Sequence, residues 1–98
     1  MVTTIEHDEA HSRFTIHVDG EQAGVAEYER DGDRWVFTHT VVQPEFSGQG
    51  VAGKLVGHAL DRVVADGGTI VPVCSYVAGY VRKNPQYQEY AEPPRPES

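Results

Sequence analysis

Hydrophobic and polar positions alternate along the first half of this chain. Within residues 13–18 the apolar Phe14, Ile16 and Val18 are separated by single polar residues, the period of a strand with one buried face. Asp19-Gly20 then supplies a two-residue hairpin turn. The pattern predicts strands over residues 2–7, 13–18, 21–30 and 34–42, and the last three form an antiparallel meander.

The strand over residues 34–42 follows a second tight turn, Asp31-Gly32-Asp33. Regular alternation divides it into two faces. One face is predicted to hold Trp35, Phe37, His39 and Val41, and the other Val36, Thr38, Thr40 and Val42. His39 is then either a reactive group or a half-buried histidine that packs beside Trp35 and Phe37.

The pattern changes to steps of three and four residues after Gly50. Apolar positions from Val51 to Val64 predict an amphipathic helix, with Ser47 as N-cap and Asp66-Gly67-Gly68 as its end. A short apolar strand over Thr69–Val73 should be buried on both faces and parallel to the strand before the helix. A second helix is expected over Ser75–Lys83.

These elements predict one α/β (α+β) domain over residues 1–90 with a disordered tail over residues 91–98. The fold comprises an antiparallel meander, a β-α-β crossover and a short C-terminal helix. A formal charge of −7 argues against a nucleic-acid partner. The single cysteine excludes an internal disulfide and is typical of the cytoplasm, and neither a leader nor a membrane span is expected.

The candidate chemistry centres on the glycine-rich turn Ser47-Gly48-Gln49-Gly50 between a predicted strand and a predicted helix. This layout aims several backbone N–H groups at one point, and the helix N-terminus adds partial positive charge there. Glycine allows close approach of a ligand and positive φ. The turn is therefore either a phosphate site that needs no basic side chain or a tight connection without a ligand.

The stretch Val42-x-Pro44-x-x-Ser47-Gly48-Gln49-Gly50-Val51-Ala52 resembles the acetyl-CoA-binding signature of the GCN5-related N-acetyltransferases. Gly50 and Ala52 fit the signature, and Ser47 stands where it has Arg or Gln. The resemblance is closest to the short single-domain branch of this superfamily and covers about residues 10–90. It is carried further by His39-Thr40, Cys74-Ser75-Tyr76, Tyr80 and Pro85-Gln86-Tyr87.

The resemblance implies acetyl-CoA as cofactor and no metal. The diphosphate of coenzyme A would be held at the glycine turn, chiefly by backbone N–H groups, and the pantetheine arm would pair with the backbone of the preceding strand. Lys54 either adds a salt bridge or is a solvated surface lysine. The cofactor-binding residues expected from the resemblance are Val41, Val42, Ser47, Gly48, Gln49, Gly50, Val51, Ala52, Gly53 and Lys54.

Three side chains are candidates for catalysis. His39 is the expected base, because histidine is largely unprotonated near neutral pH and no carboxylate lies between Val36 and Val42. Cys74 is either a nucleophile that forms an acetyl-cysteine with His39 as its base, or a small apolar filler. By resemblance Tyr80 protonates the departing thiolate; its alternative role is that of a packing residue.

The expected function is transfer of an acetyl group to an amine, either a lysine side chain or a small amine. The chain lacks the elements that shape the acceptor pocket in larger relatives, so that pocket is either open or completed by a second subunit of a homodimer. The rivals are a non-catalytic acyl-CoA-binding module and a small α/β interaction domain.

Overall fold

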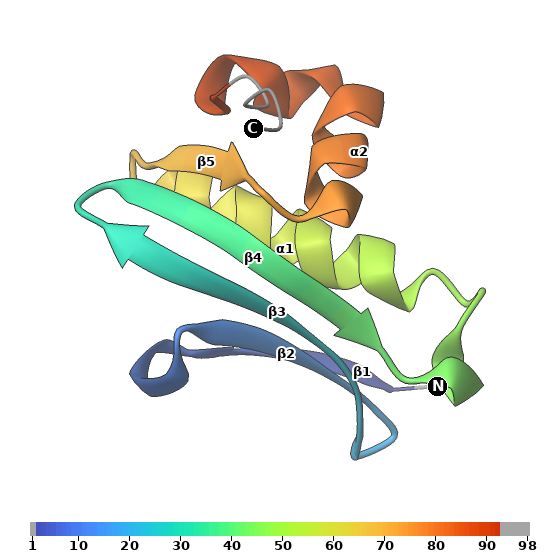
Figure 1. Cartoon of the computed structure of the whole chain (residues 1–98). Coiled ribbons are helices and arrows are strands. Elements are labelled where there is room, and N and C mark those ends of the chain that lie inside the picture. The colour runs from blue at the N-terminus through green and yellow to red at the C-terminus, as the bar shows by residue number, and fades with distance from the viewer. Residues whose placement is uncertain (1, 93–98) are drawn as a thin grey trace.

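A computed structural model describes residues 2–92 of the chain, and its five strands form one sheet (Figure 1). The strands lie in sequence order. β1 to β4 are antiparallel neighbours, and β5 pairs in parallel with β4. The strands are β1 (Thr3–Asp8), β2 (Arg13–Val18), β3 (Glu21–Asp31), β4 (Arg34–Val42) and β5 (Thr69–Pro72). The predicted meander and parallel crossover strand are confirmed.

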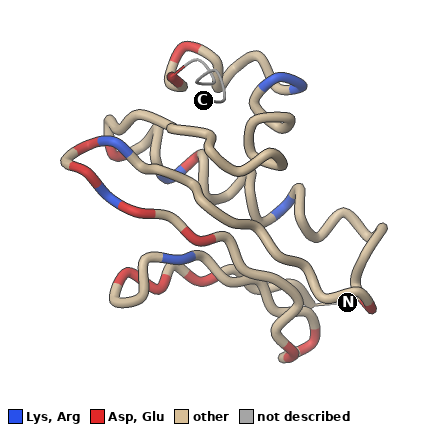
Figure 2. The backbone as a smooth tube through the Cα atoms, viewed as in Figure 1, with Lys and Arg blue, Asp and Glu red and all other residues tan. Residues whose placement is uncertain are grey.

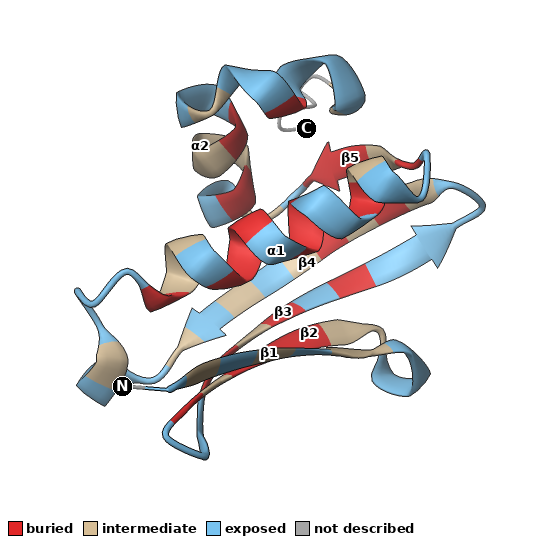
Figure 3. Ribbon diagram, turned by 180° about the vertical axis from the view of Figure 1, so that it is seen from behind, coloured by how far each residue is buried: buried red, intermediate tan, exposed pale blue. Residues whose placement is uncertain are grey.

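Helix α1 (Val51–Ala65) lies across one face of the sheet (Figure 3). Its apolar side packs on inward-facing strand residues, and Leu55, Leu60, Phe14 and Trp35 are almost inaccessible to solvent. Burial of such side chains, at about 1.5–3 kcal/mol each, is the main force that fixes the helix on the sheet. The opposite face of β1, β2 and β3 has no helix against it in the described structure (Figure 1).

Because of a β-bulge in β4, its residues do not divide between the two faces of the sheet as predicted. Glu27 of β3 pairs with His39, but the next residue, Tyr28, pairs with Phe37, so Thr38 is an extra residue in β4. An extra residue reverses the alternation beyond it. Trp35 and Phe37 are buried under α1, whereas His39 is exposed on the helix-free face. The prediction that His39 shares a face with Trp35 was wrong.

The helices begin and end close to the predicted residues, but the predicted cap was wrong. Gly50, with φ of +75°, is the residue before α1, and Ser47 instead ends a short 3-10 helix, η2 (Pro44–Phe46). Gly67, with φ of +72°, follows the end of α1 as expected. Helix α2 spans Ser75–Lys83, and the remaining 3-10 helices are η1 (Glu9–His11) and η3 (Pro85–Tyr90).

The chain after η3 returns to the edge of the sheet. Ala91 forms a bridge with Ile70 of β5, and the Glu92 N–H donates to the Ile70 carbonyl at 2.9 Å. Arg34 donates two hydrogen bonds to the Glu92 carboxylate, at 2.6 and 2.9 Å. The ordered contacts of the domain thus continue to Glu92. The rest of the predicted tail, residues 93–98, lies outside the described residues. No described helix is long and apolar enough to cross a membrane.

An aromatic cluster between the sheet and the last turns of α1 contains a partly buried histidine. The His7 ring stacks on Phe14 with centroids 4.1 Å apart, and its Nε2 shares a 2.6 Å hydrogen bond with the Tyr28 hydroxyl. Its Nδ1 is buried and has no partner among the described residues. Burial lowers the pKa of His7, because the protonated ring loses hydration in this cluster.

We expect the free energy of unfolding to decrease as the pH falls through the ordinary histidine pKa of about 6.5. Below that pH the unfolded chain binds a proton at His7 that the folded chain resists, so the folded state loses relative stability. Urea denaturation should show that the free energy of unfolding decreases less between pH 7.5 and pH 5 for His7→Phe than for the wild type. Equal losses in the two proteins would contradict this role of His7.

Candidate active site

The glycine turn lies between η2 and α1 and is open to solvent. Gly48 and Gly50 have φ of +81° and +75°, a conformation that favours glycine. An added Cβ would meet no atom within 4 Å at either position. The turn is thus a backbone surface that a ligand can approach closely.

Backbone N–H groups at this turn lack partners within the protein. No acceptor among the described residues receives a hydrogen bond from the N–H groups of residues 49–53. The Lys54 N–H, in contrast, donates to the Gly50 carbonyl at 3.1 Å, as the first bond of α1. The Lys54 N–H is thus engaged within the helix, and Lys54 itself is exposed, so that its side chain can approach an anion. Free donors and the dipole of α1 make this end of the helix suited to phosphate.

The strand before the turn has an open backbone edge. β5 pairs with β4 only over Arg34–Phe37, after which the Cys74 N–H donates to the Phe37 carbonyl at 2.8 Å and the chain turns into α2. Figure 1 shows β5 diverging from β4 at this point. Val41 is about half exposed on the helix-free face, and Val42 packs towards the core on the other. The edge of β4 beyond Phe37 can therefore pair with an extended ligand.

Cys74 lies at this divergence, directly before α2. Its Sγ hydrogen-bonds to Thr40 Oγ1 at 3.5 Å. Burial raises the pKa of the thiol, but hydrogen bonding with Thr40 and with the backbone of Val77 and Tyr76 outweighs burial and lowers the pKa below its ordinary value. A thiolate at a helix N-terminus is stabilised in the same way. A lower pKa increases the fraction of thiolate, which is the nucleophilic form of cysteine.

The structure does not bring Cys74 and His39 together as the expected nucleophile and base. Cys74 contacts Thr40, whose neighbour His39 projects from the opposite face of β4 because successive strand residues alternate. Sequence reasoning also missed a carboxylate near His39. Glu27 of β3 is its direct cross-strand partner, and both are exposed. Only the register of two strands could have indicated this pair.

Tyr80 lies on α2 and packs against α1. Its hydroxyl occupies space that glycine leaves on α1, since a Cβ at Gly57 would be 2.6 Å from that oxygen. Its ring also packs on Tyr87, whose hydroxyl donates to Asp61 at 2.6 Å. Burial, with a smaller contribution from Asp61, raises the pKa of Tyr80, so this hydroxyl keeps its proton near neutral pH.

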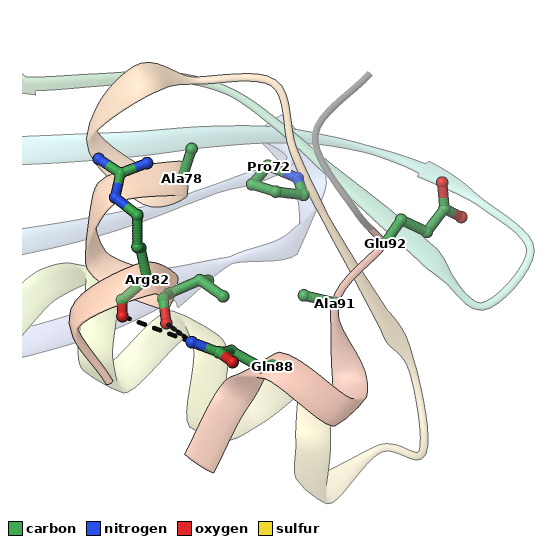
Figure 4. Close-up of a pocket in the computed structure, with 7 residues that line it drawn as sticks. Pro72, Ala78, Arg82, Gln88, Ala91 and Glu92 are labelled. Atoms are coloured by element: carbon green, nitrogen blue, oxygen red, sulfur yellow. Dashed lines mark hydrogen bonds between the residues drawn. The ribbon is translucent and has the colours of Figure 1, made fainter. Parts of the chain in front are cut away.

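A separate hollow of about 390 Å³ lies among β5, α2 and η3 (Figure 4). Its floor is largely apolar, with Pro72, Ala78 and Ala91, and two of its polar side chains, Gln88 and Glu92, bind other groups of the protein. The Gln88 amide donates to two carbonyls at the end of α2, and Glu92 binds Arg34. We assign this hollow to the packing of the C-terminal segment.

Taken together, a glycine turn at a helix N-terminus and an adjacent open strand edge are suited to a ligand in which a diphosphate is joined to an extended arm. A family model described as GCN5-related N-acetyl-transferase matches residues 13–90. The chain therefore belongs to this family, and the expected resemblance, fold and cofactor, acetyl-CoA, are confirmed at the level of the family. A sequence search of curated proteins found no significant match.

Solved structures support the same fold. A GCN5-like protein from Staphylococcus aureus has a TM-score of 0.72 at 23% identity over 94% of this chain and 90% of its own. The ribosomal-protein-S18-alanine N-acetyltransferase of Escherichia coli has a TM-score of 0.62 at 17% identity over 72% of this chain. This chain covers 49% of the Escherichia coli enzyme. N-acetylglutamate synthase from Neisseria gonorrhoeae, solved with coenzyme A and N-acetyl-glutamate, has a TM-score of 0.55 at 21% identity, over 63% of this chain and 16% of its own.

Proposed function

We propose that this protein transfers the acetyl group of acetyl-CoA to an amine, either a lysine side chain or a small amine. The observation that carries the proposal is the set of unpartnered N–H groups over residues 49–53, directly after a strand with an open edge. The first feature suits a diphosphate, and the second suits the amide-containing arm of coenzyme A. Family membership supports the same cofactor.

In the proposed complex the amides of Gln49 to Gly53 donate to the diphosphate of the cofactor, and Lys54 approaches it as a charge. The backbone of Val41 and Val42 pairs with the arm. This arrangement directs the thioester towards the bulge of β4, beside Thr40 and Cys74. Acetyl-CoA supplies an activated acetyl group there, and the protein contributes position and proton transfer.

His39 acts as the base in the proposed reaction. It removes a proton from the incoming ammonium, so that the neutral nitrogen forms a bond to the acetyl carbon while the carbon–sulfur bond breaks. Tyr80 supplies the proton that the departing thiolate takes up, and the second proton, which the nitrogen loses as the amide forms, restores the Tyr80 hydroxyl. The exposed position of His39 on the helix-free face suits a base that meets an acceptor from solvent.

Cys74 offers an alternative route. Its thiolate would attack the thioester to give an acetyl-cysteine and free coenzyme A, and the amine would then take the acetyl group from Cys74. The lowered pKa of the thiol favours this route. The contact with Thr40 rather than His39 favours direct transfer, in which Cys74 lines the thioester site.

Two measurements test the proposed function. Coenzyme A should raise the melting temperature in a concentration-dependent manner, because a ligand that binds only the folded state stabilises it by mass action. Incubation with labelled acetyl-CoA and pools of amines should then yield an acetylated amine. Stabilisation without transfer would identify a non-catalytic acyl-CoA-binding module, and the absence of stabilisation would leave a small interaction domain.

Mass spectrometry of protein incubated with acetyl-CoA alone tests the route through an acetyl-cysteine at Cys74. An acetyl group that is present on the wild type, absent from Cys74→Ala and discharged by added amine would support the covalent route. Full transfer by Cys74→Ala would reject it.

A further inference from the structure

The backbone of Cys74 is fixed between a strand and a helix. Its N–H donates to the Phe37 carbonyl of β4 at 2.8 Å, and its carbonyl accepts the first hydrogen bond of α2, from the Ala78 N–H at 3.0 Å. One backbone hydrogen bond to each element therefore holds Cys74 at the point where β5 leaves β4. From this position the side chain reaches Thr40, with Sγ at 3.5 Å from Oγ1.

The β-bulge in β4 decides that Thr40 is the residue that meets the sulfur. Strand residues alternate between the two faces of the sheet, and the extra residue Thr38 resets this alternation. His39 therefore projects to the helix-free face. Thr40 lies on the other face with Val42, which packs against the core under α1. Thr40 is half-buried there, so its contact with the thiol is partly shielded from water.

The segments around the thiol carry no charged residues. Figure 2 shows β4 after Arg34, β5 and the first turns of α2 without Lys, Arg, Asp or Glu. A low cysteine pKa is usually caused by a cationic neighbour or a helix N-terminus. Burial raises the pKa of Cys74, and the largest opposing effect comes from the Thr40 side chain, ahead of the backbone of Val77 and Tyr76. The Thr40 hydroxyl is thus the side-chain group that offsets burial.

The Thr40 hydroxyl can bind either protonation state of the thiol. In the structure the thiol donates to the Thr40 oxygen, and this hydroxyl has no other hydrogen-bond partner among residues 2–92. A hydroxyl hydrogen rotates to suit its partner, so the same contact can reverse and donate to a thiolate. A hydrogen bond to a charged acceptor is about twice as strong as one between neutral groups. The contact therefore favours the thiolate over the thiol.

We propose that Thr40 is a positioning residue, whose hydroxyl holds the Cys74 sulfur where β5 leaves β4 and donates a hydrogen bond to the thiolate. The inference deepens the proposed function, since it rests on the placement of Cys74 at the thioester site. Thr40 acts through Cys74 in two ways. It increases the fraction of thiolate, and it keeps the sulfur at a fixed place beside the thioester carbonyl.

The test measures the pKa of the thiol from the pH dependence of alkylation by iodoacetamide, without cofactor. Because the chain has one cysteine, adduct formation followed by intact-protein mass spectrometry reports on Cys74 alone. Thr40→Val removes the hydroxyl and keeps the branched shape. It should raise the pKa by about one unit, so that alkylation at pH 7 becomes about tenfold slower. Thr40→Ser keeps the hydroxyl and should retain the wild-type profile.

Thr38→Val is the matched control, because the Thr38 hydroxyl donates to the Glu27 carbonyl at 3.4 Å rather than binding Cys74. Its alkylation profile should match that of the wild type. A wild-type profile in Thr40→Val, or an equal shift in Thr40→Ser, would overturn the assignment. If circular dichroism shows that Thr40→Val does not fold, Thr40→Ala is measured in its place with the same expectation. Failure of the proposed cofactor function is seen separately, as the absence of stabilisation by coenzyme A, because alkylation needs no cofactor.

Discussion

Replacement of Gly50 by glutamate should abolish coenzyme A binding. The new carboxylate would project at the point where the N–H groups of residues 49–53 meet the diphosphate. Two like charges about 4 Å apart repel by about 4 kcal/mol at an effective dielectric constant of about 20, which corresponds to about a thousandfold loss of affinity. The measurement is calorimetric titration with coenzyme A, accompanied by the shift in melting temperature.

A matched variant separates this effect from backbone strain. Gly50 has φ of +75°, so any side chain there also costs about 1–2 kcal/mol of stability. Gly32, in the turn between β3 and β4, has φ of +63° and open space around it. Gly32→Glu should therefore lose similar stability and gain the same charge, yet bind coenzyme A as the wild type does. Normal binding by Gly50→Glu would refute the diphosphate site.

Replacement of His39 by alanine should lower kcat by a factor of about 10²–10⁴, the usual contribution of a general base. Stabilisation by coenzyme A should be unchanged, because His39 is exposed on the face opposite α1 and contacts neither the turn nor the core. Steady-state kinetics with acetyl-CoA and an accepted amine provide the measurement. Added imidazole should restore part of the rate if the lost group is a base.

His58→Ala serves as the control, since His58 is an exposed histidine on α1. It should keep the wild-type kcat. Turnover in His39→Ala that matches the control would exclude His39 as the base. If Cys74→Ala also retained full activity, neither His39 nor Cys74 would have a catalytic role. Only the proposed cofactor site would then still be supported.

Much of this fold could be predicted from local pattern. Alternation in β2 and the three- and four-residue steps of α1 both reflect a single buried face, and each pattern is complete within one segment. Gly50 and Gly67 adopt the positive φ expected of glycine at these turns. The position of the glycine turn before α1 was predictable for the same reason, because it depends on residues adjacent in sequence.

Predictions that depended on how two segments pair with each other were less successful. The extra residue Thr38 cannot be seen in the pattern of β4 alone, because the bulge exists only relative to β3. Because of this extra residue, His39 lies on the opposite face from Trp35 and pairs with Glu27. The extra residue also places Thr40, rather than His39, against Cys74.

The sequence by itself determined which segments form strands and helices, where glycine permits the open turn before α1, and which side chains can carry acid–base chemistry. These properties follow from backbone preferences and from the spacing of apolar residues along one segment. The tertiary structure decided which face His39 occupies, which group the Cys74 thiol contacts, and which carboxylate lies beside the proposed base. Those relations depend on strand register, which is fixed only when α1 and the sheet bury their apolar faces together.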